Sequence, residues 1–393
     1  MTPAARIAAA IEILDSHLAG VAAEQALTGW ARSHRFAGSG DRAAIRDHVF
    51  DALRCRRSFA ALGGAPEAPT GRALMIGALR NGGIPPETQF TGAGHGPSPL
   101  TPAERDAFPP ELSRNVAIDC PDWLAPMLED GLGDTFVPVM QMLRRRAPVT
   151  LRVNLARTSR AEAQTALSAE GVVTVPHPLA EAALQVTENP QKLRNSVPYL
   201  DGRIELQDAA SQAVVEMLPL AGAKRVLDYC AGGGGKTLAM AARVPGQYVV
   251  HDIAANRMRD LPERARRAGI RVELADTCRV TALAPYDLVL LDVPCSGSGS
   301  WRRAPEAKWA LTPARLAELR EIQSRILDET HALVAPGGTL AYVTCSMLGS
   351  ENVEQVSAFL ERITGWGCTQ QRSFTPLEGG DGFFCALLTR TTR

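Results

Sequence analysis

Apolar residues recur at helical spacing from Ala4 to about Gly83. Ile7, Ile11 and Leu14 illustrate the pattern, because side chains three or four residues apart lie on the same face of an α-helix. Strand-like alternation is rare in this region. The pattern therefore predicts a bundle of helices near the N-terminus.

A segment rich in glycine and proline follows these helices. Residues 82–101 contain five glycines and four prolines, which interrupt both helices and strands. Further on, Val149, Leu151 and Val153 alternate with polar residues, as in a strand with one buried face, and residues 161–169 have a helical pattern. We expect a loop or an interdomain linker at residues 82–101 and then a small α/β unit.

From about residue 204 onward, short apolar runs alternate with helical stretches. The runs at 225–227, 248–250, 288–291 and 340–343 are typical of strands in a parallel sheet that is buried on both faces. We therefore predict an α/β fold with a mostly parallel sheet. The expected domains are an all-α domain with its linker (1–115), a small α/β unit (116–203) and a larger α/β domain (204–393).

Charge and cysteine content narrow the possible partners. Lys+Arg and Asp+Glu both number 42 in 393 residues, so no global field attracts nucleic acid, and RNA contacts must come from local arginine clusters such as 54–57 and 144–146. No apolar stretch is long and uncharged enough to span a bilayer.

The eight cysteines lack zinc-ligand spacing, which favours free thiols in a reducing compartment. We expect a cytoplasmic monomer with no metal and no membrane segment.

A glycine-rich segment lies between a predicted strand, which ends at Asp228, and a helix. It comprises Cys230, Ala231, Gly232, Gly233, Gly234, Gly235 and Lys236, followed by Thr237. Its glycines allow a ligand to approach the backbone closely. A phosphate-binding P-loop is an alternative interpretation, although it would need glycine where Cys230 stands; the apolar run ending at Asp292 would then supply a magnesium ligand.

Acidic residues follow the next two predicted strands. Asp252 lies about sixteen residues beyond the glycine-rich segment, where a carboxylate can accept both hydroxyls of a ribose. Asp276 follows the next candidate strand and could meet an adenine amino group. A single aspartate at such a place is more often a helix cap, but two in this order favour a nucleoside cofactor.

Two cysteines each close a predicted strand. Cys295 follows Asp292-Val293-Pro294, and Cys345 lies between Thr344 and Ser346. Because the carboxyl ends of neighbouring parallel strands meet at one crevice, both thiols can face the same substrate. We interpret the remaining cysteines Cys55, Cys120, Cys278, Cys368 and Cys385 as buried and inert.

These motifs together resemble the Sun/RsmB-type RNA cytosine-5 methyltransferases over roughly residues 118–393. The matching segments are 206–212, 230–237, 292–299, 302–309, 344–346 with 351–352, and 379–384. More weakly, the N-terminal helices resemble the NusB-like RNA-binding domain of many members. One departure is Gly232-Gly233, where the family usually has Ala-Pro, so cofactor affinity could be modestly lower.

The resemblance implies a class I AdoMet methyltransferase fold and a role for each motif. S-adenosyl-L-methionine would be held by residues 230–236, Asp252, Arg257, Asp276 and Asp292. The substrate would be a cytosine in RNA, with small-subunit ribosomal RNA favoured. Cys345 would be the nucleophile, and Cys295 would assist release of the product.

The chemistry explains why such residues are needed. Carbon 5 of cytosine is too weak a nucleophile to attack AdoMet, so a thiolate, here Cys345, must first add to carbon 6. A protonated Asp292 at N3 would stabilise the charge that develops. Lys236 could lower the pKa of a thiol or only bind carbonyls of its own loop.

The target base must be unstacked to reach such a crevice, which favours single-stranded or loop RNA. Arg302, Arg303 and Lys308 could hold its phosphates. Two other functions remain possible, a P-loop-like nucleotide hydrolase and a non-catalytic RNA-binding or ribosome-assembly protein with a methyltransferase shell. A uracil methyltransferase is disfavoured because its motifs around the thiol differ.

Overall fold

The computed structural model describes residues 1–107 and 111–391. The chain forms two compact units, one of Met1–Arg146 with Trp301–Ala310 and the other of Ala147–Ser300 with Leu311–Arg393. Residues 108–110 of the first predicted domain and 392–393 of the third lie outside the described residues. These units differ from the three predicted domains, because residues 116–146 pack with the helical part.

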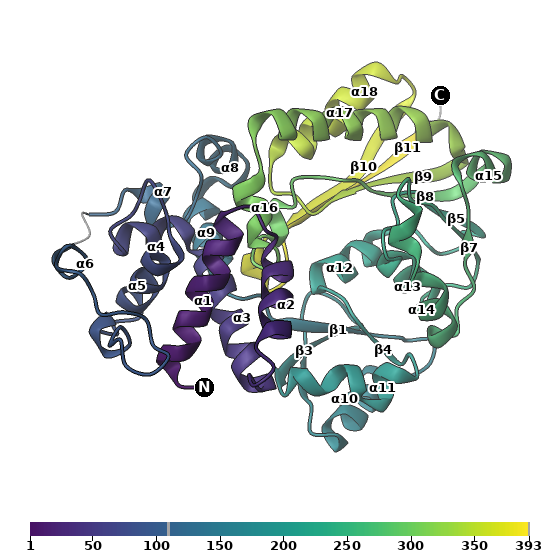
Figure 1. The fold of residues 1–393 in the computed structure, drawn as a ribbon. Coiled ribbons are helices and arrows are strands. Elements are labelled where there is room, and N and C mark those ends of the chain that lie inside the picture. The colour runs from purple at the N-terminus through teal and green to yellow at the C-terminus, as the bar shows by residue number, and fades with distance from the viewer. Residues whose placement is uncertain (108–110, 392–393) are drawn as a thin grey trace. The chain divides into compact units, whose positions relative to one another are not determined.

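The first unit is built from helices, as the N-terminal pattern predicted (Figure 1). Its core contains Leu14, Ile45, Leu53 and Leu74, all at most 1% exposed. Because apolar residues repeat along each helix, every helix has one face to contribute to this core. The helices are α1 (Pro3–Leu18), α2 (Ala23–Ser33), α3 (Ser39–Arg54), α4 (Arg56–Leu62), α5 (Gly71–Asn81), α6 (Pro102–Asp106), α7 (Arg114–Ala117), α8 (Ala125–Leu132), α9 (Phe136–Leu143) and α16 (Pro305–Ala310).

The segment predicted to be a loop or a linker belongs to this helical core. Residues 82–101 have little regular structure beyond the short 3-10 helix Pro86–Thr88. Phe90 and Leu100 are nevertheless 2% and 3% exposed and pack in the core, and the Arg72 guanidinium lies 4.8 Å from the centre of the Phe90 ring. The segment is therefore a loop rather than an interdomain linker, because the glycines and prolines break the helices while the chain stays packed on the core.

The second unit contains a small antiparallel sheet. Its strand order is β2 (Val173–Pro176), β3 (Ala183–Glu188), β1 (Val149–Val153) and β4 (Ile204–Leu206). Helix α10 (Arg160–Ala169) begins at a capping box formed by Ser159 and Glu162, and α11 (Val197–Leu200) follows β3. Because β4 pairs with β1, the predicted boundary between residues 203 and 204 falls inside this sheet.

The larger sheet has seven strands. Their order is β10 (Trp366–Phe374), β11 (Phe383–Arg390), β9 (Val334–Thr344), β8 (Tyr286–Asp292), β5 (Arg225–Asp228), β6 (Gln247–Val250) and β7 (Glu273–Leu274). The run from β9 to β7 is parallel, whereas β11 and β10 are antiparallel. The predicted fold class, a mostly parallel α/β sheet preceded by a small α/β unit and a helical region, is confirmed.

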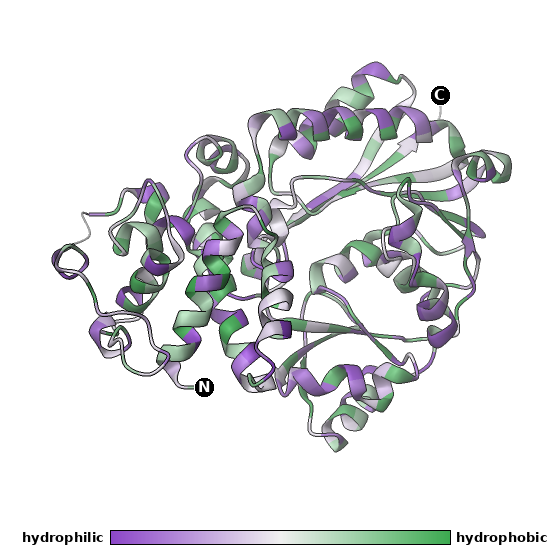
Figure 2. Cartoon of the chain, in the orientation of Figure 1, coloured by the Kyte–Doolittle hydropathy of each residue, from purple (hydrophilic) through white to green (hydrophobic). Residues whose placement is uncertain are grey.

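Both faces of this sheet are buried. Successive residues of β8 point to opposite faces: Leu288 and Leu290 join one apolar cluster, and Val289 and Leu291 join the other. Helices cover the sheet, and Figure 2 shows bands of hydrophobic and hydrophilic residues along α17, which is typical of such a covering helix. They are α12 (Ala209–Met217), α13 (Gly235–Ala241), α14 (Leu261–Ala268), α15 (Thr277–Leu283), α17 (Pro313–Thr330) and α18 (Val353–Arg362).

No helix in residues 1–107 or 111–391 is long and apolar enough to cross a bilayer. The parallel strands β5, β6, β8 and β9 end at the same edge of the sheet, and the motif residues follow these ends.

Candidate active site

The two cysteines at the strand ends lie side by side. Sheet register pairs Asp292 of β8 with Val343 of β9, so the turns after these strands leave the sheet at the same level. Cys295 Sγ is 3.4 Å from Cys345 Sγ, and the Gly299 amide donates a 2.9 Å hydrogen bond to the Cys345 carbonyl. As whole residues, both cysteines are partly exposed.

The two thiols differ in their tendency to ionise. The hydrogen bond from Cys295 is the largest influence on the pKa of Cys345 and lowers it, against the effect of burial. The same hydrogen bond, together with burial, raises the pKa of Cys295 well above its usual range. Of the two thiols, Cys345 is therefore the one that ionises more readily, and the thiolate is the nucleophilic form of cysteine.

Lys236 links the glycine-rich segment to the thiols. It lies in α13, and its Nζ is 2.6 Å from Asp292 Oδ2. Burial acts to lower the pKa of the amine, but the charge and hydrogen bond of Asp292, together with the nearby Cys345 and Asp228, outweigh burial, and the pKa is raised. The positive charge of Lys236 in turn helps to lower the pKa of Cys345. Of the two roles predicted for Lys236, the geometry favours the electrostatic one.

The glycine-rich segment is fixed by Asp252 at the end of β6. Asp252 Oδ2 accepts hydrogen bonds from the Gly232 amide at 2.8 Å and from Arg257 at 3.0 Å, and Oδ1 accepts from the Ala254 amide at 2.9 Å. Gly234 has a φ of +75°, and a Cβ there would overlap the side chain of Leu261. The loop conformation therefore depends on glycine at this position.

Asp228 is a site residue that the motif analysis did not select. It is 1% exposed at the end of β5, Thr237 Oγ1 donates a 2.6 Å hydrogen bond to its Oδ2, and Oδ1 has no partner among the described residues. Burial raises its pKa to about 7. Its sequence signal was an acidic residue closing the strand just before the glycines. An unpartnered carboxylate oxygen beside this loop suits the ammonium group of an amino-acid ligand such as the methionine part of AdoMet.

Asp276 lies at the next strand end, as predicted, but it also has a capping role. Its side chain is exposed and accepts a 2.8 Å hydrogen bond from the Arg279 amide at the start of α15. The adjacent Thr277 hydroxyl is 3.1 Å from His251 Nε2, which ties this turn to the end of β6. Contact between Asp276 and adenine stays a prediction.

Two of the three residues expected to bind RNA phosphates are buried in the helical unit. Lys308 is 1% exposed, its ammonium donates a 3.0 Å hydrogen bond to the Arg54 carbonyl, and burial lowers its pKa to about 8. Arg302 is 2% exposed, and its carbonyl accepts a 2.7 Å hydrogen bond from Arg54 Nε. Arg303 is exposed. In this structure the phosphate-binding expectation is therefore wrong for Lys308 and Arg302, whose segment packs among the helices.

The arginine clusters of the helical unit also take part in ion pairs. Arg144 Nε is 2.7 Å from the fully buried Asp119, and Arg146 is 2.7 Å from Asp47. Arg54 is 2.7 Å from Asp51. Ion pairs within the protein therefore explain much of this clustering of arginines, and a nucleic-acid partner is not needed to explain it.

Two further sequence matches meet behind the thiols. The Gly382 amide donates a 2.9 Å hydrogen bond to the Gly299 carbonyl, and a Cβ on Gly299 would overlap the Gly382 carbonyl. Asp208 Oδ1 accepts a 3.0 Å hydrogen bond from the Asp381 amide. The segment 379–384 thus contacts the turn after Cys295 on one side and the start of α12 on the other.

The other cysteines divide into two groups. Cys55, Cys120 and Cys385 are buried, as expected. Cys278 and Cys368 are exposed, so the prediction of burial was wrong for these two. Within the described ranges, no group of three or more His, Cys, Asp or Glu side chains could hold a metal ion.

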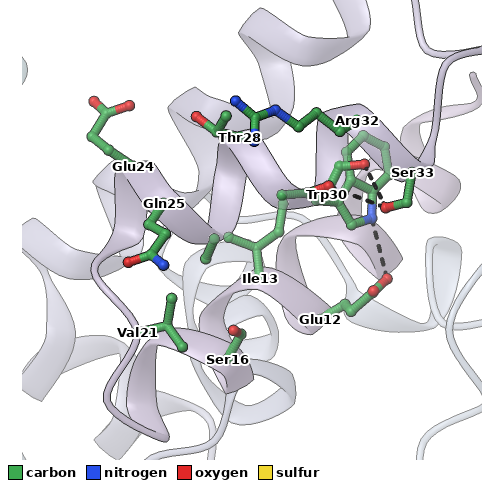
Figure 3. Close-up of a pocket in the computed structure, with 12 residues that line it drawn as sticks. Glu12, Ile13, Ser16, Val21, Glu24, Gln25, Thr28, Trp30, Arg32 and Ser33 are labelled. Carbon is green, nitrogen blue, oxygen red and sulfur yellow. Dashed lines mark hydrogen bonds between the residues drawn. The ribbon is translucent and has the colours of Figure 1, made fainter.

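A cavity of about 760 Å³ lies in the helical unit (Figure 3). Its lining comes from α1, α2 and the turn between them, and the Trp30 indole donates a 3.1 Å hydrogen bond to Glu12. None of the predicted catalytic or cofactor residues lines it. The predicted catalytic and cofactor residues all lie in the second unit.

In this arrangement, the two side chains that a P-loop would use for phosphate and magnesium are already bonded to aspartates. Lys236, which would contact phosphate, is bonded to Asp292, and Thr237, which would bind magnesium, donates to Asp228. The paired cysteines have no role in such a site. The geometry instead supports transfer chemistry that uses a thiolate.

Two family models match the chain. Residues 215–389 match the model described as 16S rRNA methyltransferase RsmB/F. Residues 120–192 match the ferredoxin-like domain described for RsmF/B-like methyltransferases. The first match covers nearly all of the large sheet and its covering helices except most of α12, and the second covers most of the small sheet.

Curated relatives carry the same designation. Ribosomal RNA small subunit methyltransferase B of Vibrio cholerae is 34% identical over 283 residues, which are 69% of this chain and 65% of the relative. The Citrobacter koseri protein of that name is 32% identical over 284 residues, 69% of this chain and 66% of the relative. The match thus spans slightly less than two thirds of the length of these relatives.

A solved structure extends the likeness to three dimensions. A methyltransferase homologue from Pyrococcus horikoshii has a TM-score of 0.63 and 22% sequence identity, over 75% of this chain and 100% of that one. At this identity the likeness concerns the fold. The matched domains, together with relatives that are 34% and 32% identical over 69% of this chain, show that the chain belongs to the RsmB/F methyltransferase family.

Proposed function

We propose that this protein methylates carbon 5 of a cytosine in RNA, with small-subunit ribosomal RNA as the favoured substrate. The main support is the pair Cys295 and Cys345, 3.4 Å apart, with a raised pKa on the first and a lowered pKa on the second. A thiolate beside a thiol suits a reaction that needs both a nucleophile and a proton carrier. The name of the curated relatives supports the choice of ribosomal RNA.

The methyl donor in this proposal is S-adenosyl-L-methionine, which supplies an electrophilic methyl group when bound. Asp228 would hold its amino group, since one of its buried oxygens lacks a partner among the described residues. Asp252, already bonded to Gly232 and Arg257, would receive the ribose hydroxyls. Asp276 would meet the adenine. The glycine-rich residues 230–235 would line the methionine part.

Attack on the base would proceed from Cys345. The electron pair of its thiolate forms the bond to carbon 6, and the ring charge is neutralised by a proton delivered to N3 through the Lys236 and Asp292 pair. Carbon 5 then has the electron density to take the methyl group. Asp292 is suited to this task because its side chain is 31% exposed while Lys236 is 8% exposed, so the carboxyl can meet the base.

Release would depend on Cys295. Once Cys345 is bonded to the base as a thioether, its sulfur is no longer charged. The hydrogen bond to that charged sulfur is the largest cause of the raised pKa of Cys295, so this cause is removed. Cys295 can then lose its proton to solvent and remove the carbon 5 proton. The electrons of that C–H bond form the double bond between carbons 5 and 6, the sulfur–carbon 6 bond breaks, and N3 returns its proton. Cys295 is again protonated beside a Cys345 thiolate.

The remaining parts of the proposal concern the whole chain. The helical unit would act as a NusB-like RNA-binding domain, and the protein would work as a cytoplasmic monomer on unpaired RNA. Arg303 is the exposed member of the three cationic residues first assigned to phosphates.

The decisive experiment traps the covalent intermediate. Cys295→Ala protein, incubated with AdoMet and small-subunit RNA either free or within the subunit, should give an RNA-linked band on denaturing gels, because attack proceeds but release fails. The Cys295→Ala/Cys345→Ala double variant should give none. Absence of the band with an RNA that the wild type methylates would rule out the two-cysteine mechanism. RNA binding without methylation of any RNA would favour a non-catalytic binding protein.

A further inference from the structure

A buried carboxylate connects the two cysteine turns. Glu351 is 0% exposed in the short helix Gly349–Glu351, behind β8 and β9. Its Oε1 accepts hydrogen bonds from the Ser296 amide at 2.8 Å and from Gln323 Nε2 at 3.0 Å. Its Oε2 accepts from the Ser296 hydroxyl at 2.5 Å and from the Ser346 hydroxyl at 2.6 Å. Ser296 and Ser346 are the residues that directly follow the two reactive cysteines.

The number of donors shows why a charged group can be buried here. A carboxylate removed from water costs several kcal/mol unless its oxygens receive hydrogen bonds. Glu351 receives four, two of them from the turn that carries Cys295. The Tyr342 hydroxyl also donates a 2.7 Å hydrogen bond to the Glu351 carbonyl, which fixes the residue against β9. The surrounding residues therefore provide hydrogen-bond donors that match the carboxylate of Glu351.

The two turns depend on this acceptor to different degrees. The Cys345 turn is anchored on both sides of the thiol by Asn352, whose Nδ2 donates a 2.9 Å hydrogen bond to the Ser346 carbonyl and whose Oδ1 accepts a 2.6 Å hydrogen bond from the Thr344 hydroxyl. It also continues directly from β9. The Cys295 turn has one comparable anchor, a 2.9 Å hydrogen bond from Gln323 Nε2 to the Pro294 carbonyl. In the Cys295 turn, both the amide and the hydroxyl of Ser296 donate to Glu351. Loss of Glu351 would thus free Cys295 more than Cys345.

We propose that Glu351 is a positioning residue that holds Cys295 within reach of Cys345 and of the methylated base, so that it acts mainly on product release. The inference rests on the proposed two-cysteine mechanism and adds to it the group that sets the distance between the thiols. Glu351 does not touch the base. Its effect passes through Ser296 and the backbone of the Cys295 turn.

Release and attack respond differently to such a displacement. When Cys295 moves away, Cys345 can still add to carbon 6 and the methyl group can still be transferred, although the thiolate loses a hydrogen bond. The carbon 5 proton then has no nearby acceptor. Glu351→Ala should therefore behave like a weaker Cys295→Ala and leave protein covalently linked to RNA.

The test uses Glu351→Ala, Glu351→Gln and Cys295→Ala in the full-length chain with AdoMet and an RNA methylated by the wild type. Glu351→Gln keeps the side-chain shape and so guards against misfolding of the alanine variant. It replaces one of the two acceptor oxygens with a donor, so the amide and the hydroxyl of Ser296 can no longer both donate to charged oxygens as they do to Glu351. Glu354→Ala is the matched control, because Glu354 lies three residues further along, is exposed and pairs with Arg320 on the surface.

We expect single-turnover methyl transfer within about threefold of wild type, steady-state kcat lowered at least tenfold, and a Cys345-dependent RNA-linked band in both Glu351 variants. Glu354→Ala should match the wild type. Adding Glu351→Ala to Cys295→Ala should change release little, because both act on the same step.

The experiment distinguishes failure of the two-cysteine mechanism from failure of the role proposed for Glu351. If Cys295→Ala gives no band, the two-cysteine mechanism itself fails. If Cys295→Ala gives the band but folded Glu351→Gln and Glu351→Ala do not, or if they slow methyl transfer and turnover equally, the positioning role of Glu351 is refuted and the mechanism stands. Should Glu351→Ala not fold, Glu351→Gln alone decides between these outcomes.

Discussion

Thr237 donates a 2.6 Å hydrogen bond to one oxygen of Asp228, while the other oxygen of this buried carboxyl has no partner among the described residues. Burial raises the pKa of Asp228 to about 7. The carboxyl is therefore poised to ionise near neutral pH, beside the loop proposed to hold the cofactor.

Asp228→Asn should change how the stability of the cofactor-free protein depends on pH. Between about pH 4 and pH 7 the folded protein holds a proton that the unfolded chain has lost, so ionisation of Asp228 lowers the free energy of unfolding as the pH rises. The variant lacks this component, which is on the order of a few kcal/mol at pH 8. Thermal unfolding between pH 5 and pH 8 should show a flatter profile for Asp228→Asn. Parallel profiles would contradict the raised pKa.

Cys295→Ala should make Cys345 ionise at a higher pH, because the hydrogen bond from Cys295 is the largest influence lowering the pKa of Cys345. The rate of alkylation of Cys345 by iodoacetamide, followed by mass spectrometry of its peptide, should shift towards alkaline pH. Cys295→Ser, which keeps a donor, should shift it less. An unchanged profile in Cys295→Ala would mean that the thiol pair is not coupled.

Lys236→Met should slow the formation of the covalent adduct by about 100-fold, since it removes both the proton source at Asp292 and a positive charge near Cys345. The optimum of single-turnover methyl transfer should also move to higher pH. Lys224→Met is a suitable control, because Lys224 is exposed. A wild-type rate in Lys236→Met would leave the lysine with a structural role in its loop.

Lys308→Ala should destabilise the protein rather than weaken RNA binding. Its buried ammonium donates to the Arg54 carbonyl, and loss of that hydrogen bond and of the packed stem should cost about 2 kcal/mol. The slope of log affinity against log salt should stay at its wild-type value. Arg303→Ala should instead reduce this slope by about 1. A reduced slope in folded Lys308→Ala would restore the phosphate contact first expected from the sequence.

The pairing of the thiols could be predicted because it depends only on topology. Parallel strands end at one edge of a sheet, and the apolar runs before Cys295 and Cys345 identify those strands. The glycine-rich segment and Asp252 follow the same rule, and the structure brings them together.

Features set by packing could not be predicted from the local sequence. Lys308 and Arg302 read as surface cations, but Trp301–Ala310 packs among helices that are distant in sequence. Phe90 and Leu100 look like isolated apolar residues in a linker, yet both fill the helical core. Asp228 gave little signal, because the burial that perturbs it comes from its neighbours in the sheet.

The close approach of Gly299 and Gly382 has a consequence for sequence variation. Gly299 performs no chemistry, yet its amide holds the Cys345 carbonyl and its Cα faces the Gly382 backbone with no room for a Cβ. Even alanine would force one backbone away from the other and alter the turn that starts at Cys295. In a library of single substitutions, position 299 should therefore tolerate as few replacements as the reactive cysteines, although its side chain is a single hydrogen atom.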